Sequence, residues 1–165
     1  MSTRRFVLAV FALVAFVVGC STPDPQPPAS VTRDALVGTW RHQLPNHEQY
    51  ELVLFDSGIV AFIHANEKLP ISRSFGRWSF DDGTLDLRIV GTEGGEGAEF
   101  PLANRLYVQR VAGTLSFEFE GARTTWSAHD RYGAARDGAD DRRAKDERDW
   151  AQSVERAEQA ATATP

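Results

Sequence analysis

The most reactive side chain in the sequence is a single thiol. Cys20 is the only cysteine among 165 residues, and it directly follows Gly19 and an unbroken apolar run from Phe6 to Val18. One cysteine cannot form a disulfide within the chain, so covalent modification is the chemistry open to it. The proline-rich stretch Thr22–Pro28 comes next and favours an extended polyproline tether. A buried core cysteine is therefore the less favoured interpretation.

The residues ahead of the thiol are typical of a secretory leader. Arg4 and Arg5 form a positively charged start, an apolar segment follows, and Gly19 supplies the small residue before a cleavage site. The apolar segment is shorter than the ~20 residues that a membrane-spanning helix needs. We therefore expect residues 1–19 to be a signal peptide. The general secretory route is favoured, and the arginine pair leaves the twin-arginine route open.

Val17, Val18, Gly19 and Cys20 resemble the lipobox of bacterial lipoproteins. The resemblance implies a diacylglyceryl group on the Cys20 thiol, cleavage that makes Cys20 the first residue, and further acylation, for example by palmitate, of its amino group. Two or three acyl chains give a lasting membrane anchor, which one chain does not. Residues 20–30 would then be the lipidated cysteine and its tether. Because Ser21 is not the aspartate linked to inner-membrane retention in that family, the resemblance implies the outer membrane, facing the periplasm.

Histidines are the next candidates for chemistry. His42 and His47 flank a loop that contains a proline, and His64 and His129 stand far apart in the sequence. A zinc site would need histidines four apart on a helix, or alternating on a strand, with a supporting carboxylate. No spacing of this kind occurs, so we expect surface histidines, no metal and no cofactor.

The acidic residues and serines give no catalytic pattern either. Residues 91–99 are glycine-rich, but the segment carries glutamates that would repel phosphate and lacks the alternating ligands of a calcium loop. Asp81 and Asp82 are adjacent and fit a tight turn better than a pair of catalytic carboxylates. Ser57 does not lie in a nucleophile elbow. We expect a protein that is not an enzyme.

The charge balance limits the partners. The formal net charge is −5, and it becomes more negative once Arg4 and Arg5 leave with the leader. Proteins that bind nucleic acid present basic faces, so nucleic acid is not an expected partner. Without a polybasic patch, the acyl groups must provide the attachment to the membrane.

Apolar residues alternate with polar ones through residues 31–131, which predicts an all-β domain. Turn residues such as Asp56-Ser57-Gly58 and Asp81-Asp82-Gly83 separate the apolar runs. About eight sequential antiparallel strands result, and eight strands can close into an up-and-down barrel without leaving an edge. A two-sheet sandwich fits the same turn spacing and stays open. The expected strands are 37–43, 50–55, 59–65, 76–80, 84–90, 104–111, 114–120 and 123–129.

"LVGTW", with Gly38 two residues before Trp40, resembles the Gly-x-Trp signature of lipocalins and of the lipocalin-like domains of bacterial lipoproteins. "LFDSGIV" and "GRWSFDDGTLDL" resemble later landmarks of those domains. The resemblance implies a lipocalin-like barrel. It also implies an arginine packed across Trp40, for which Arg131 is the first candidate and Arg123 the second.

The residues expected to face the barrel interior are mostly bulky. An eight-stranded barrel is either filled by its side chains or holds one small ligand. If it is hollow, we expect a small apolar ligand; if it is filled, we expect a non-catalytic interaction module, such as an inhibitor or assembly factor, with an envelope protein as partner. The candidate lining residues are Trp40, Phe62, Trp78, Phe117 and Trp126.

Residues 132–165 differ in composition from the β domain. Glycines, alanines and charges predict a flexible joint, and a charged helix is expected from Asp140 to about Ala161. Trp150 and Val154 belong to a thin apolar stripe along it. This stripe fits either docking on the barrel or binding of a partner protein.

Overall fold

The computed structural model describes most of the chain from Val31 onward. The expected signal peptide, Cys20 and the tether lie outside the described residues, as do His47 and most of the acidic glycine-rich segment. The described residues are 31–44, 48–66, 69–94, 104–111, 114–119 and 122–163.

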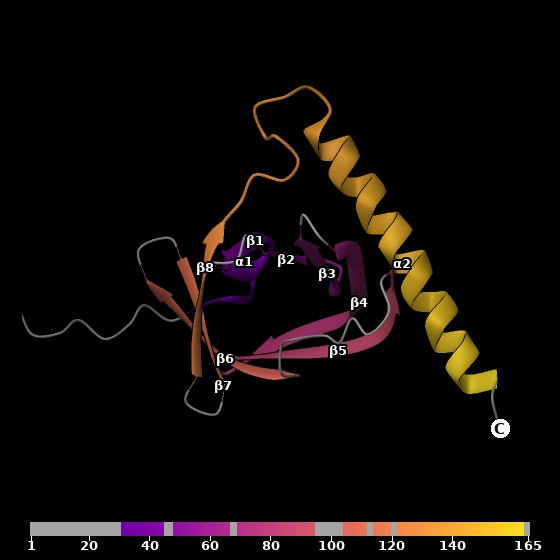
Figure 1. Ribbon diagram of the computed structural model, residues 1–165, viewed down its shortest axis with the longest axis horizontal. Coiled ribbons are helices and arrows are strands. Elements are labelled where there is room, and N and C mark those ends of the chain that lie inside the picture. The colour runs from indigo at the N-terminus through magenta and orange to yellow at the C-terminus, as the bar shows by residue number, and fades with distance from the viewer. Residues whose placement is uncertain are drawn as a thin grey trace, which may run out of the picture.

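Eight strands close into one barrel (Figure 1). Each strand pairs antiparallel with the next one along the chain, and β8 pairs back with β1. The eight-stranded closed antiparallel barrel predicted from the sequence is confirmed, and the two-sheet alternative is wrong. The strands are β1 (Gly38–Gln43), β2 (Gln49–Leu54), β3 (Ile59–Asn66), β4 (Leu69–Asp81), β5 (Thr84–Glu93), β6 (Arg105–Val111), β7 (Thr114–Phe119) and β8 (Ala122–Ala128).

The barrel closes at a short seam between its first and last strands. Trp40 lies opposite Ala128, and Arg41 lies opposite Ser127. The seam brings the residues that follow β8 alongside β1, and this proximity builds a cluster of charges described below.

Both faces of β2 are buried from Glu51 onward. Leu52 and Leu54 point into the barrel, while Val53 and, just after the strand, Phe55 lie in a second apolar cluster outside it. All four side chains are almost inaccessible to solvent. A strand buried on both faces shows a continuous apolar run instead of alternation, as "LVLF" does.

A short helix that the sequence did not predict, α1 (Arg33–Leu36), leads into β1. Thr32 caps it by accepting a hydrogen bond from the backbone of Ala35 at 3.4 Å. Leu36 is fully buried in the barrel core, and its carbonyl accepts a hydrogen bond from the Trp40 indole at 2.8 Å. Helix α1 thereby fixes the entry of the first strand.

β4 extends from Leu69 to Asp81, well beyond the predicted residues 76–80. Its pairing with β5 shifts register after Phe75, where Gly76 approaches the facing backbone closely. A Cβ atom at Gly76 would lie 1.9 Å from the carbonyl oxygen of Arg88, so only glycine fits there.

A long helix, α2 (Ala139–Ala163), packs along the outside of the barrel against β3, β4 and β5 (Figure 1). This confirms the C-terminal helix predicted from Asp140 onward. Val154 is fully buried in the outer apolar cluster, and the Trp150 ring lies 5.9 Å from the Phe75 ring. Among the described residues, no helix is long and apolar enough to cross a membrane.

The segment between β8 and α2 is a series of hydrogen-bonded turns. Both carboxylate oxygens of Asp130 accept from the backbone of Ala134 at 2.9 Å. Arg142, at the start of α2, donates to the carbonyls of Tyr132 at 2.7 Å and Asp137 at 2.9 Å. These bonds tie the segment expected to be a flexible joint to the helix that follows it.

Candidate functional site

The five residues predicted to line a ligand site all lie in the barrel core. They belong to one apolar cluster and expose almost none of their surface. Their exposed fractions are 5% for Trp40, 2% for Phe62, 5% for Trp78, 1% for Phe117 and 1% for Trp126.

Aromatic rings fill the interior around Trp126. Its ring centroid lies 5.7 Å from that of Phe117, 6.4 Å from that of Phe62 and 5.4 Å from that of His42. Tyr50 stacks on Phe62 at 5.4 Å. Rings at these separations contact one another directly, so this level of the barrel is packed with side chains.

The other two tryptophans among these five residues are fixed by hydrogen bonds to the backbone. The Trp78 indole donates to the carbonyl of Phe55 at 2.8 Å, as that of Trp40 does to Leu36. The Arg33 guanidinium lies over the Trp78 ring, 4.7 Å from its centroid. Buried indole N–H groups need such partners, so these contacts are explained by the fold itself.

Arg131 has other partners than the expected Trp40 ring. It donates to Glu51 at 2.5 Å, and its guanidinium lies over the Tyr132 ring at 6.0 Å from the centroid. The second candidate, Arg123, donates to Glu118 at 2.6 Å on the outer face of the sheet. The buried carboxylate of Glu51 accounts for the position of Arg131, because such a charge requires partners.

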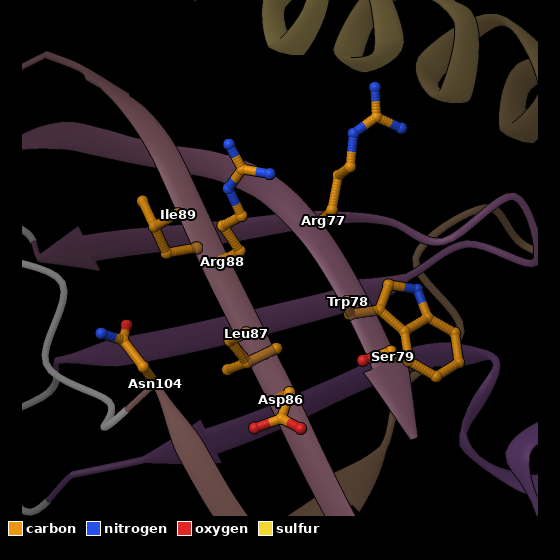
Figure 2. Close-up of a pocket in the computed structure, with 8 residues that line it drawn as sticks. All are labelled: Arg77, Trp78, Ser79, Asp86, Leu87, Arg88, Ile89 and Asn104. Atoms are coloured by element: carbon orange, nitrogen blue, oxygen red, sulfur yellow. The ribbon is translucent and has the colours of Figure 1, made fainter. Parts of the chain in front are cut away.

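A groove with a volume of about 580 Å³ lies over β4 and β5. In the described part of the chain, β6 pairs only with Thr84–Asp86 at the start of β5, and the next residues of β5, Leu87 to Ile89, border the groove. The Arg77 and Arg88 side chains extend from the groove toward α2 (Figure 2). The groove is lined by Arg77, Trp78, Ser79, Asp86, Leu87, Arg88, Ile89 and Asn104.

The charged side chains of the groove contact oppositely charged neighbours. Arg77 donates twice to Glu158 of α2, at 3.0 and 2.9 Å, and Arg88 lies 4.0 Å from the same carboxylate. The hydrogen bond from Arg77 lowers the pKa of Glu158 below its ordinary value. Asp86, also part of the lining, accepts from Arg105 at 2.8 Å. The groove therefore offers apolar side chains between the Asp86–Arg105 ion pair and two arginines that share one carboxylate.

Each of the three described histidines contacts a neighbouring residue of the fold. His42 Nδ1 lies 2.8 Å from the carbonyl of Thr125, and His129 lies 3.5 Å from Glu51. His64 packs against the Tyr50 ring at 4.6 Å. Within the described residues, no group of three or more His, Cys, Asp or Glu side chains could hold a metal ion.

The groove was not predicted from the sequence, although one signal for it was present. In "LDLRIV" the alternation places Arg88 on the opposite face to Leu87 and Ile89. The alternation did not predict that β4 is long enough to pair with all of β5. It also did not predict that the pairing of β6 with β5 ends after three residue pairs.

Comparisons of the chain with protein-family models, with curated proteins and with solved structures found no match.

Proposed function

We propose that the chain is a membrane-anchored lipoprotein of the bacterial envelope that binds a small apolar ligand in the groove on β4 and β5. The volume of the groove, about 580 Å³, supports this, because small-molecule sites commonly measure about 300–1,000 Å³. Trp78 and Leu87 form an almost fully buried floor, and Ile89 is partly exposed. Such a surface would contact a hydrocarbon group.

The packed interior leaves no room for a ligand at the barrel centre, so we place the proposed ligand in the groove. Phe62, Phe117 and Trp126 occupy the level at which a central ligand would lie. Burying apolar surface in the groove would stabilise the complex by about 25 cal/mol per Å². Glu158 holds the flanking Arg77 and Arg88 toward α2, and the apolar side chains of the lining support an apolar ligand.

The ligand proposal can be tested with the chain from Val31 onward, because the described barrel and α2 both lie within it. We expect native mass spectrometry of this protein, incubated with an envelope lipid extract and repurified without detergent, to show a stoichiometric added mass that lipid extraction identifies. Ser79→Phe would place a ring in the groove and should abolish the added mass. Ser127→Phe makes the same change at an exposed serine of β8 outside the groove and should preserve it. A bare wild-type mass would refute ligand binding.

The anchor proposal has a separate test at Cys20. Cells grown with a palmitate analogue should incorporate it into the wild-type protein, which should fractionate with the outer membrane. Cys20→Ser should remove both the label and the attachment. Label that persists in the variant would contradict acylation at this residue.

The second candidate function is a non-catalytic interaction module with an envelope protein as partner. The observation that favours it is Tyr107 on β6, which is 62% exposed on a part of the barrel that α2 does not cover. Tyrosine and arginine are enriched at protein interfaces, and Arg105 lies two residues away on the same strand face. Tyr107→Ala should then remove a cross-linked neighbour that Tyr107→Phe retains. Equal cross-linking by both variants would count against this surface.

A further inference from the structure

A second pocket lies where the end of β8 meets the start of α2, away from the groove. Its volume is about 420 Å³. Three parts of the chain build it: the paired strands β1 and β2, the turns after β8, and the first turns of α2. It is lined by Arg41, Glu51, His129, Arg131, Tyr132, Arg142, Lys145 and Asp146.

A buried carboxylate organises two of the arginines in this pocket. Glu51 has only 7% of its side chain exposed, and its two oxygens accept from Arg41 at 2.6 Å and from Arg131 at 2.5 Å. Arg41 also contacts the ring nitrogen of His129. Each guanidinium carries five N–H donors, so one carboxylate does not use them all.

The pocket has more positive than negative side chains. Four of its lining residues are Arg or Lys and two are Glu or Asp. Lys145 is bonded to Asp149 at 2.5 Å, just outside the lining. Arg142 donates to two backbone carbonyls and, in the part of the chain that the structure describes, has no carboxylate partner. The positive excess is therefore centred on Arg142.

A second observation concerns the donors of Arg41. The Nε atom of Arg41 is buried and has no hydrogen-bond partner among the described residues. Buried donors are almost always bonded in folded proteins. This pocket thus combines an unneutralised guanidinium with an unused donor, in a protein whose net charge is negative.

We propose that this pocket binds the phosphate group of a phosphomonoester. A phosphate monoester carries about −1.5 to −2 charges at neutral pH and accepts several charge-assisted hydrogen bonds, which suits guanidinium donors better than one carboxylate would. The pocket is larger than a phosphate group, so part of the organic moiety would also lie within it. A ligand here would bridge the barrel and α2.

Calorimetric titration of the chain from Val31 with inorganic phosphate, and then with glycerol 3-phosphate, tests the site. We expect saturable binding that weakens as salt is added. Arg142→Ala should weaken it by about tenfold, as for loss of one charge-assisted hydrogen bond, and Lys145→Ala should weaken it less, because Asp149 already pairs with Lys145. Both leave Arg41, Glu51 and Arg131 intact.

The matched control is Arg148→Ala, which removes the same charge from an exposed position of α2 outside the pocket lining. It should change the affinity by less than about twofold. Circular dichroism establishes that each variant is folded. Absence of saturable binding, or equal losses in Arg142→Ala and Arg148→Ala, would overturn the proposal.

Vesicles distinguish a lipid headgroup from a soluble phosphomonoester. Phosphatidylcholine vesicles with and without phosphatidic acid should be floated with the unacylated protein. Recruitment that requires phosphatidic acid and is lost in Arg142→Ala identifies a headgroup as the source. Binding of glycerol 3-phosphate without recruitment identifies a soluble one. The groove on β4 and β5 is not involved in either outcome. Absence of phosphate binding therefore leaves the apolar-ligand proposal unaffected, and absence of an apolar ligand leaves the phosphate proposal unaffected.

Discussion

Arg131 donates to Glu51 at 2.5 Å and joins residues that are 80 positions apart in the sequence. Glu51 lies on β2, and Arg131 lies in the turns that lead to α2. Arg131 also approaches Asp146 of α2, at 3.6 Å. A single guanidinium therefore connects the barrel wall, the turns and the helix, which makes this cluster the electrostatic link between the two main parts of the fold.

Replacing Glu51 with glutamine should destabilise the protein by about 2 kcal/mol at pH 7, because it leaves Arg41 and Arg131 without their shared negative charge. Urea unfolding measures the change. Glu118→Gln is the matched control, since Glu118 pairs with Arg123 on the exposed face. That variant should lose less than about 1 kcal/mol. Equal losses of unfolding free energy in the two variants would show that burial does not strengthen the ion pairs of Glu51.

The same cluster should make stability depend on acidity. Burial raises the pKa of Glu51, but the hydrogen bond from Arg41 and the charge and hydrogen bond of Arg131 outweigh burial, so the pKa lies below its ordinary 4.5. The unfolded chain then binds this proton at higher pH than the folded chain does. The stabilisation is complete well above pH 4.5 and is lost as the pH falls through the lowered folded value. The difference between wild type and Glu51→Gln should therefore narrow from pH 7 to pH 3; a constant difference would contradict this assignment.

Tyr132 should make the stability of the protein depend on pH at high pH. Burial, followed by the charge of Asp146, raises its pKa from 10.0 to about 12. The unfolded chain ionises first as the pH rises, so the stabilisation is present below pH 10 and is lost by about pH 12. Ultraviolet titration should show one tyrosine ionising near pH 12 that Tyr132→Phe removes and Tyr107→Phe keeps. An unchanged titration in Tyr132→Phe would refute the shift.

The regular parts of the fold were predictable because local patterns determine them. Alternation in "TLDLRIV" and turn residues such as Asp82 and Gly83 gave strand positions close to those observed for β5. The apolar stripe with Trp150 and Val154 predicted the helix that the structure shows as α2. Period-two burial and turn chemistry are local properties of the sequence, and so their positions can be predicted without knowledge of the partners.

The candidate sites were not predictable because they depend on contacts between distant residues. Arg131 was expected to pack on Trp40 by resemblance, whereas a carboxylate on β2 provides its partner. The first half of β4, from Leu69 to Phe75, has a proline and two serines between its apolar residues and becomes a strand through its pairing with β3 and β5. Tertiary pairing decides such segments, because strand propensity depends strongly on context.

The close approach of β4 to β5 gives a prediction about glycine. Gly76→Ala should destabilise the protein by about 3 kcal/mol, because its methyl group would overlap the Arg88 carbonyl. Gly83→Ala is a useful comparison: no atom lies within 4 Å of the added carbon, but its φ of 74° disfavours other residues. That change should cost about 1 kcal/mol. Urea unfolding of both variants separates steric overlap from backbone strain, and a smaller loss at Gly76 would contradict the register.

Val154 tests whether α2 is an integral part of the domain. Its side chain is fully buried in the cluster with Phe55 and Phe75, so Val154→Asp would place a carboxylate among apolar groups without a partner. We expect α2 to detach and hydrogen exchange of its backbone amides to accelerate strongly. Gln152→Asp adds the same charge at an exposed position of the helix and should keep the protection.

Detachment of α2 should also expose the apolar outer face of β2 and β4. Binding of a hydrophobic fluorescent dye should therefore increase in Val154→Asp and remain unchanged in Gln152→Asp. If Val154→Asp kept both its amide protection and its low dye binding, the helix would not depend on this contact. The observed packing uses the apolar stripe of α2 within the chain, so only a detached helix could offer that stripe to a partner protein.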